Sequence, residues 1–216
     1  MAEAIDNQPF PIWVLNLERS RDRRSYMERQ LNELNWRFEI VPAVDSRYLG
    51  SEDLKHYSTQ EAMKTIQREL KPGEIGCALS HAKMWARIVA ENIEEVLILE
   101  DDVTIKRELL DVLDTRSTFP GDWELINFRT DVQKIPVGPP VYAGYRICHF
   151  QRYDNRTCAY FINTKGAKKL CDHVYPIRWA ADGLTGRTYI SDLVSYGIYP
   201  DLVELANFPS LISDEI

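Results

Sequence analysis

The sequence runs from Val96-Leu97-Ile98-Leu99 directly into Glu100-Asp101-Asp102. Four consecutive aliphatic residues bounded by charges are typical of a strand that is buried on both faces, as in the middle of a parallel sheet. The preceding residues 74–92 carry an apolar face at helical spacing, formed by Ile75, Ala78, Leu79, Ala82, Trp85, Ile88 and Val89. Because ligands of open α/β sheets gather outside the carboxyl ends of the strands, the three acidic residues mark the expected site.

The N-terminal part of the chain predicts a strand, a helix and a second strand. Residues 11–17 form the first apolar run, and the charged residues 18–29 follow it at once. The predicted helix turns Tyr26, Met27, Leu31 and Leu34 inward and carries Arg21, Arg23, Arg24, Glu28 and Arg29 at its start and on its outer face. Residues 38–41 suit the second strand. This order indicates a parallel α/β unit.

The rest of the chain continues the alternation. Residues 45–57 are polar and irregular, and a helix over 59–70 ends at Lys71-Pro72-Gly73. After the acidic triplet we expect a helix to about residue 113, a strand at 123–128, a loop over 135–144, a strand at 157–162 and a helix from about Thr164. The final third mixes short strands with loops. Because no linker or internal repeat interrupts the pattern, we expect one domain over residues 1–216.

Composition narrows the classes of function. The chain has 216 residues and a net charge of −7, so we expect no nucleic-acid partner. Its four cysteines are widely spaced, which favours reduced thiols. The sequence opens with acidic and polar residues in place of a basic and apolar leader, and it contains no apolar run of about 18 residues. We therefore expect a cytoplasmic protein, with any contact to the inner membrane peripheral on its cytoplasmic face.

The acidic triplet has two interpretations on spacing alone. Side chains of an extended segment alternate, so Glu100 and Asp102 share one face and Asp101 takes the other. Clustered carboxylates repel one another unless a cation neutralises them, and their oxygens suit Mg²⁺ or Mn²⁺. The alternative is a solvated acidic turn that caps the next helix, because carboxylates favour a helix N-terminus.

Four motifs occur here in the order and spacing of a known family. They are NLERSRDRR at 16–24, AVDSR at 43–47, GEIGCALSH at 73–81 and ILEDDV at 98–103, and TCAYFI at 157–162 with KGA at 165–167 adds a later block. The chain resembles glycosyltransferase family 25, which contains bacterial lipooligosaccharide galactosyltransferases and procollagen galactosyltransferases. The resemblance implies an α/β fold of GT-A type, a Rossmann-like mixed sheet flanked by helices. Residues of about 10–130 would form the nucleotide-sugar-binding half and about 140–216 the acceptor-side half.

The resemblance also implies an activity. It is the inverting transfer of a hexose, expected to be galactose, from a UDP-sugar to a saccharide or glycolipid acceptor of lipooligosaccharide type, with Mn²⁺ or Mg²⁺ as cofactor. The family's metal motif falls on Glu100, Asp101 and Asp102. Asp102 is the first choice of direct ligand with Glu100 beside it, whereas Asp101 is expected on the donor side. The metal would hold the donor diphosphate and stabilise charge on the departing UDP.

Further donor contacts are expected at the ends of the first two strands and near the start of the long helix. The candidates are Asn16, Leu17, Arg19, Arg23, Arg24, Asp45, Gly76, Ser80 and His81. The arginines could instead lie on a solvated helix face, and the aspartate could be a turn residue that binds its own backbone. The serine and histidine could simply cap or pack.

An inverting transfer needs a general base for the acceptor hydroxyl, and a carboxylate is the usual group. Asp182 and Asp192 are the candidates in the last third, because apolar and aromatic neighbours predict partial burial and a raised pKa. Asp182 is preferred, since nearby Trp179 offers a surface for stacking a sugar. Each could instead be a hydrogen-bonded loop aspartate.

Two other functions fit part of this pattern. A metal-dependent nucleotidyltransferase would use the same carboxylates, but it should carry a glycine-rich basic loop near the first strand, and residues 16–24 contain no glycine. A non-catalytic nucleotide-sugar or glycan-binding protein could keep the fold without turnover. The intact acidic triplet argues against that second alternative.

Overall fold

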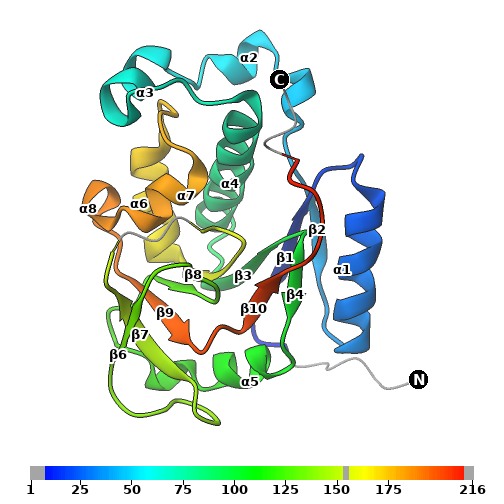
Figure 1. Cartoon of the computed structure of the whole chain (residues 1–216), viewed down its shortest axis with the longest axis vertical. Helices are drawn as coiled ribbons and strands as arrows, with labels where there is room; N and C mark the ends of the chain where they lie inside the picture. Colours follow the sequence, from blue (N-terminus) through cyan, green and yellow to red (C-terminus); the bar gives the residue numbers. More distant parts are fainter. Residues whose placement is uncertain (1–7, 153–155, 212–216) are drawn as a thin grey trace.

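One mixed sheet of eight strands runs through the molecule in the order β2-β1-β3-β8-β5-β9-β7-β6 (Figure 1). The computed structural model describes residues 8–152 and 156–211. The strands of this sheet are β1 (Ile12–Asn16), β2 (Glu39–Pro42), β3 (Glu95–Glu100), β5 (Leu125–Asn127), β6 (Lys134–Pro136), β7 (Arg146–Phe150), β8 (Ala159–Asn163) and β9 (Ser195–Tyr199). A separate two-stranded sheet pairs β4 (Val103–Ile105) with β10 (Val203–Leu205).

The strand directions bring β1, β3 and β8 together at one edge of the sheet. β1 is parallel to both β2 and β3, whereas β8 lies antiparallel between β3 and β5. The end of β3 therefore meets the start of β8, where Leu99 pairs with Ala159 and the backbone N–H of Glu100 donates to the carbonyl of Cys158 at 2.8 Å. Residues from distant parts of the sequence thus lie beside the carboxylates that follow at the end of β3.

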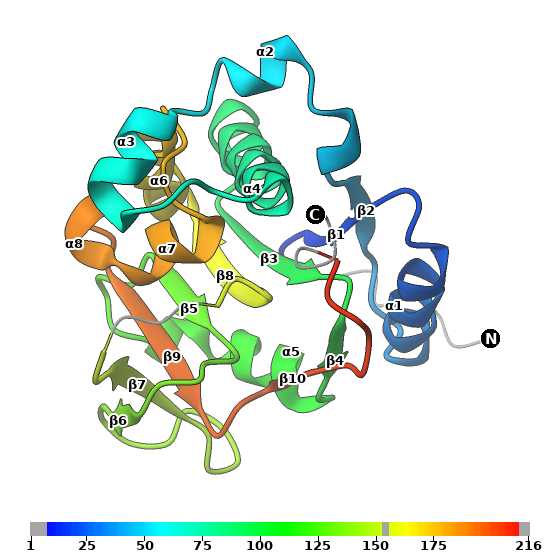
Figure 2. The same cartoon turned by 45° about the horizontal axis from the view of Figure 1, so that its top comes forward.

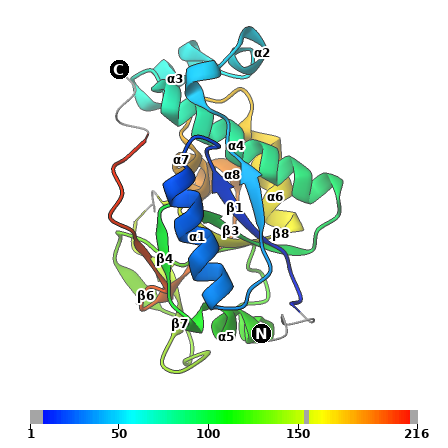
Figure 3. The same ribbon diagram turned by 90° about the vertical axis from the view of Figure 1, so that its right-hand side faces the viewer.

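Helices cover both faces of the sheet, and Figure 3 shows α1 on one side and α4 with α6 on the other. The main helices are α1 (Arg21–Glu33), α4 (Pro72–Ala90), α5 (Glu108–Asp114), α6 (Thr164–Val174) and α7 (Ala181–Gly186). Leu97 and Leu99 of β3 pack with α1 and α5 residues, whereas Val96 and Ile98 pack with α4 and α6 residues. Burial on both faces explains why this strand is apolar throughout.

The expected mixed α/β sheet flanked by helices is confirmed, but several local predictions were wrong. The helix after the acidic triplet begins only at Glu108, because Val103 and Ile105 turn inward in β4 and pair with β10. Residues 45–57 contain the 3₁₀ turn η1 (Ser46–Tyr48) and the short helix α2 (Ser51–Leu54). β6 overlaps the start of the expected loop, and α7 and α8 (Thr188–Ser191) occupy part of the final third. The remaining short elements are α3 (Thr59–Ile66) and η2 (Arg116–Thr118).

The segment that follows β10 lies across the carboxyl ends of β1 and β3 (Figure 2). The backbone N–H of Ala206 donates to the carbonyl of Asp102 at 2.7 Å, and Ser210 and Leu211 line a pocket with Glu100 and Asp101. The last described residues thus form one side of the pocket that contains the acidic triplet. None of the helices in the described ranges has the length and apolar character required to span a membrane.

Candidate active site

Two pockets meet at the carboxyl end of β3. The first, of about 110 Å³, lies toward β1 and β2 and includes Leu17 and Val44 in its lining. The second, of about 350 Å³, lies toward α7 and includes Asp182. Both pockets are lined by Cys77, Glu100, Asp102 and Ser210. The two carboxylates therefore stand at the junction, where one ligand on each side could reach them.

Asp101 is held by buried partners. Asn16 Nδ2 donates to Asp101 Oδ2 at 2.7 Å, and Arg23 donates to Asp101 Oδ1 at 2.9 Å. Burial raises the pKa of Asp101, and the Arg23 charge and the Asn16 hydrogen bond oppose that rise. Both oxygens are thus engaged within the protein. Asn16 and Asp101, two expected donor contacts, bind each other instead and fix the ends of β1 and β3 together.

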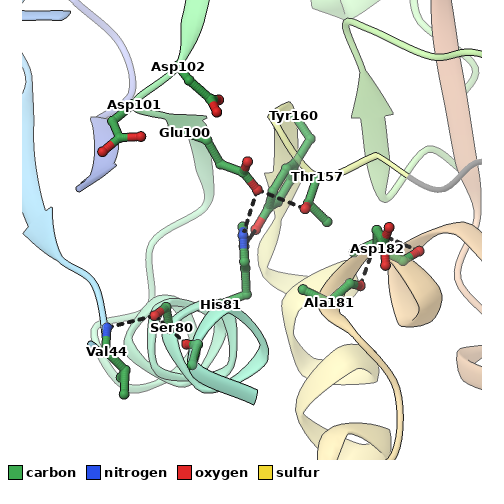
Figure 4. A network of polar contacts seen from close by, with 12 residues as sticks. Val44, Ser80, His81, Glu100, Asp101, Asp102, Thr157, Tyr160, Ala181 and Asp182 are labelled. Atoms are coloured by element: carbon green, nitrogen blue, oxygen red, sulfur yellow. Dashed lines mark hydrogen bonds and ion pairs between the residues drawn. The ribbon is translucent and has the colours of Figure 1, made fainter. Parts of the chain in front are cut away.

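Glu100 sits at the end of a chain of hydrogen bonds that begins in the core (Figure 4). Trp85 Nε1 donates to the Tyr160 hydroxyl at 2.9 Å, and that hydroxyl lies 2.9 Å from His81 Nδ1. Because the indole can only donate, the Tyr160 hydrogen is available to His81 Nδ1, which assigns the Nε2–H tautomer. His81 Nε2 lies 3.3 Å from Glu100 Oε1, and Thr157 donates to the same oxygen at 2.9 Å.

These contacts set the protonation state of Glu100. Burial raises the pKa of this carboxyl, but the hydrogen bonds from His81 and Thr157, with the Arg23 charge, outweigh it and leave the pKa below its ordinary value. Glu100 is therefore ionised and oriented at neutral pH. His81, which sequence reasoning placed near an anion, is fully buried and contacts a carboxylate.

Asp102 is the carboxylate of the triplet that has a buried oxygen without a hydrogen-bond partner among the described residues. Arg23 donates to its Oδ2 at 3.0 Å, while Oδ1 is buried without a hydrogen-bond partner in the described parts of the chain. Burial and the neighbouring charges of Glu100 and Asp101 together raise the pKa of Asp102 to about 6, although Arg23 opposes the rise. A buried oxygen acceptor among like charges fits a hard divalent cation, which prefers carboxylate oxygens.

The expected extended backbone ends at Glu100, because Asp101 and Asp102 form a turn between β3 and β4. Figure 4 shows Asp101 directed away from Glu100 and Asp102. The alternative of a solvated helix cap does not fit, because β4 separates the triplet from α5.

Arg23, and not Arg24, is the arginine that faces this site. Its side chain is 9% exposed, whereas Arg24 forms an exposed pair with Glu28 on the outer face of α1 at 2.8 Å. Placing Arg23 on the outer face was therefore wrong. It precedes the buried Met27 by one helical turn, so the same spacing that identified the core face also contained the signal for Arg23.

The other expected donor contacts near β2 have structural partners. Arg19 pairs with Asp45 at 3.1 Å, and Asp45 also accepts from the Arg47 backbone and side chain as the N-cap of η1. These contacts lower the pKa of Asp45, with the Arg47 hydrogen bond contributing most. Asp45 thus behaves as the turn residue of the alternative interpretation. Leu17 keeps a place in the lining of the first pocket.

Gly76 and Ser80 join α4 to the loop after β2. A Cβ on Gly76 would lie 2.8 Å from the carbonyl oxygen of Val44, and Ser80 Oγ accepts from the Val44 N–H at 2.8 Å. Because α4 begins at Pro72, both residues lie inside the helix. Their backbone N–H groups therefore bond within the helix and are not available to bind a phosphate, as a contact at the start of the helix would require.

The two candidates for the general base have different surroundings. Asp182 lines the second pocket, and burial raises its pKa with a further contribution from Glu100, while the Gly183 backbone N–H opposes the rise. The side chain of Asp192 is 100% exposed beside Lys169, so its expected burial was wrong. Trp179 lies outside the lining of the second pocket, and the Arg187 guanidinium covers its ring at 5.0 Å.

The fold and the site together define an α/β protein in which two carboxylates lie between two pockets at the carboxyl ends of the strands. The chain belongs to glycosyltransferase family 25: the model of "Glycosyltransferase family 25 (LPS biosynthesis protein)" matches residues 10–185. The family expected from the sequence motifs is therefore confirmed.

Curated relatives carry the same family name or a related one. The chain is 38% identical over 176 residues to a glycosyltransferase 25 family member of Aedes aegypti, covering 74% of this chain and 28% of that protein. It is 32% identical over 169 residues to human procollagen galactosyltransferase 2, covering 74% of this chain and 27% of that protein. The chain thus spans little more than a quarter of the length of these relatives. Among solved structures, mouse xyloside xylosyltransferase 1 is similar at 13% identity and a TM-score of 0.40, covering 86% of this chain and 63% of that chain.

Proposed function

We propose that this chain transfers a hexose, with galactose as the first expectation, from a UDP-sugar to a hydroxyl of a saccharide acceptor, with inversion at the anomeric carbon. The observation that carries the proposal is the buried, unpartnered Oδ1 of Asp102 beside Glu100 at the junction of two pockets. Membership of the family supports the class of reaction. The relatives named as galactosyltransferases support the choice of sugar.

Glu100 and Asp102 would hold Mn²⁺ or Mg²⁺. A divalent cation, when bound, stabilises the negative charge that develops on the departing diphosphate. Glu100 is suited to this role because His81 and Thr157 orient it through one oxygen. Asp102 contributes the oxygen that lacks a protein partner, and Arg23 fixes its other oxygen. Asp101 would hold Asn16 and Arg23 in position beside the site, since these two residues donate hydrogen bonds to both of its oxygens.

The two pockets suit two substrates. We assign the first pocket to the nucleotide, because it lies at the ends of β1 and β2, where open α/β sheets bind such ligands. Its volume is about 110 Å³, whereas small-molecule sites occupy roughly 300 Å³ or more. Ser210 and Leu211 line it, so we expect this segment to move aside when the donor binds.

The second pocket is assigned to the acceptor, with Asp182 as general base. A base must accept a proton from the attacking hydroxyl, and a raised pKa makes a carboxylate a better acceptor near neutral pH. Burial raises the pKa of Asp182, and its pocket shares Glu100 and Asp102 with the donor side. A hydroxyl bound there would approach the sugar from the side opposite the nucleotide, as inversion requires. We do not assign Asp192 as the general base, because its side chain is fully exposed.

The test measures UDP release from UDP-galactose and other UDP-hexoses by the purified chain, with Mn²⁺ or with a chelator. We expect release only with metal and a loss of at least about 100-fold in Asp102→Asn. Asp182→Asn should lower turnover by about 10²–10⁴-fold while UDP binding persists. The matched control is Asp192→Asn, a change of the same chemistry outside both pockets.

The same experiment separates the alternatives. Metal-independent release, or normal turnover by Asp102→Asn, would contradict the metal assignment. Binding of UDP without any turnover would indicate a non-catalytic protein. Pyrophosphate formation from UTP and a sugar phosphate, in place of UDP release, would indicate a nucleotidyltransferase.

A further inference from the structure

We propose that Cys77, His81 and Glu100 form a second cation site, selective for thiophilic ions such as Zn²⁺ or Cd²⁺, whose occupation withdraws Glu100 from the carboxylate pair. Cys77 and His81 lie one turn apart on α4 and face the end of β3. One ligand atom from each of the three residues lies within 4.8 Å of the others. This thiol, imidazole and carboxylate set differs in chemistry from the all-oxygen pair of Glu100 and Asp102.

The spacing of the nitrogen and oxygen ligands is close to that of a tetrahedral zinc site, and the Cys77 sulfur lies within 4.8 Å of both. Zinc bonds of about 2.1 Å to nitrogen and oxygen at a tetrahedral angle put those two atoms about 3.4 Å apart. His81 Nε2 and Glu100 Oε1 are 3.3 Å apart. A zinc–sulfur bond of about 2.3 Å puts sulfur about 3.6 Å from the nitrogen, so a rotation of the Cys77 side chain completes the third contact.

The surroundings already contain the outer partners that such ligands need. The Tyr160 hydroxyl lies 2.9 Å from His81 Nδ1, and Thr157 donates to Glu100. When a cation takes Nε2, the ring proton resides on Nδ1, and Nδ1–H then donates a hydrogen bond to the Tyr160 oxygen, as the second ring nitrogen of a metal-bound histidine donates to an outer partner. The Cys77 S–H proton passes to solvent as the metal–sulfur bond forms.

We expect the fourth coordination position of such a cation to face the two pockets. Cys77 and Glu100 line both pockets, so a cation there is accessible from the substrate side. Three protein ligands with a fourth position open is the pattern of exchangeable zinc sites rather than closed structural ones. Soft thiolate favours Zn²⁺ and Cd²⁺ over Mg²⁺ or Mn²⁺. The two sites therefore compete for one carboxylate, and micromolar zinc should inhibit any reaction that needs Glu100.

The test is spectroscopic and does not depend on turnover. The purified chain is titrated with Cd²⁺ in the presence of excess Mg²⁺, and the ultraviolet thiolate-to-cadmium band is recorded together with Zn²⁺ affinity from a competing chelator dye. We expect one equivalent to saturate the band. Cys77→Ser should abolish the band and weaken Zn²⁺ binding by about 100-fold or more, since even loss of an outer-shell partner costs 10–100-fold.

Two other thiols serve as controls. Cys171→Ser, half-buried on α6, should leave the band unchanged. Cys158 is buried beside the same pocket, and the assignment is wrong if Cys158→Ser, rather than Cys77→Ser, removes the band. The proposal also fails if wild type shows no thiolate band at one equivalent of Cd²⁺. Circular dichroism checks that each variant is folded, and His81→Gln provides a second ligand deletion.

Asp102→Asn separates this inference from the proposed function. The variant should lose Mn²⁺ binding yet keep the cadmium–thiolate band, because Asp102 is absent from the second set. If the chain turns out to have no transferase activity, the cation site can still be measured. If the transferase works but zinc binding is unchanged in Cys77→Ser, only the inference is overturned.

Discussion

The Asp102 carboxylate should destabilise the metal-free protein above pH 6. The structure raises the pKa of Asp102 from 3.8 to about 6, with burial as the main cause. A shift of about 2 pKa units corresponds to about 3 kcal/mol, at 1.36 kcal/mol for each unit. Asp102→Asn removes this charge while keeping the shape of the side chain, so it should stabilise the apo protein at pH 8.

The sign of the pH dependence follows from linkage. Between pH 4 and pH 6 the native state holds the Asp102 proton more strongly than the unfolded chain does, so the free energy of unfolding falls as pH rises through this window. Below pH 4 the carboxyl is protonated in both states and the penalty vanishes. The pKa of about 6 already includes the opposing Arg23 charge and hydrogen bond, so their loss is not subtracted again. The net gain should therefore approach about 3 kcal/mol at pH 8 and be close to zero at pH 4, where the native carboxyl is neutral in wild type as well.

Urea unfolding with a chelator, at pH 4 and pH 8, measures both quantities. The informative number is the difference between Asp102→Asn and wild type at each pH, because other carboxylates cancel in it. Mn²⁺ should reverse the order at pH 8 by stabilising wild type alone. The reasoning is refuted if the variant is destabilised by the same amount at both pH values. Asp192→Asn, fully exposed, should follow wild type throughout.

Three further substitutions test the packing around the site. Arg23→Met leaves two carboxylates without their buried cation and should cost about 3–5 kcal/mol in urea unfolding, whereas a loss under 1 kcal/mol would mean that water already screens the pair. Gly76→Ala places a Cβ 2.8 Å from a backbone oxygen and should cost about 1–3 kcal/mol, while Gly121→Ala, with nothing within 4 Å, should not. Tyr160→Phe leaves the buried Trp85 N–H without its acceptor and should lower the free energy of unfolding by about 1–3 kcal/mol. It should also weaken Mn²⁺ binding, measured by calorimetry, because Glu100 loses its orientation; unchanged Mn²⁺ affinity would limit Tyr160 to a packing role.

The centre of the fold could be predicted from sequence because its signals are local. β3 was identified by four aliphatic residues that end in charges. α4 and α6 carry apolar faces with clear helical spacing. In each case the residues that decide the structure are neighbours in the sequence.

The parts that sequence reasoning missed depend on contacts between distant residues. β4 has only three residues and exists because β10, about 100 positions later, pairs with it. Arg23 was listed both on the outer face of its helix and among the candidate donor contacts, but its partners, Asp101 and Asp102, lie 78 and 79 positions later in the sequence. Likewise, no local pattern indicates that Ser210 and Leu211 line the first pocket.

The charges at the site explain why its residues are arranged as they are. Three carboxylates end β3, and Arg23 is the guanidinium that contacts two of them. One positive charge against three negative ones leaves a deficit of two, which matches one divalent cation. The excess negative charge is not equally destabilised at the three residues. Asn16 and Arg23 bind both oxygens of Asp101, and hydrogen bonds lower the pKa of Glu100. Asp102 is left with the uncompensated charge, because its pKa is raised to about 6 and one of its oxygens has no hydrogen-bond partner among the described residues. The destabilised charge of Asp102 therefore lies where a bound cation would remove the penalty, so cation binding should stabilise this end of the sheet.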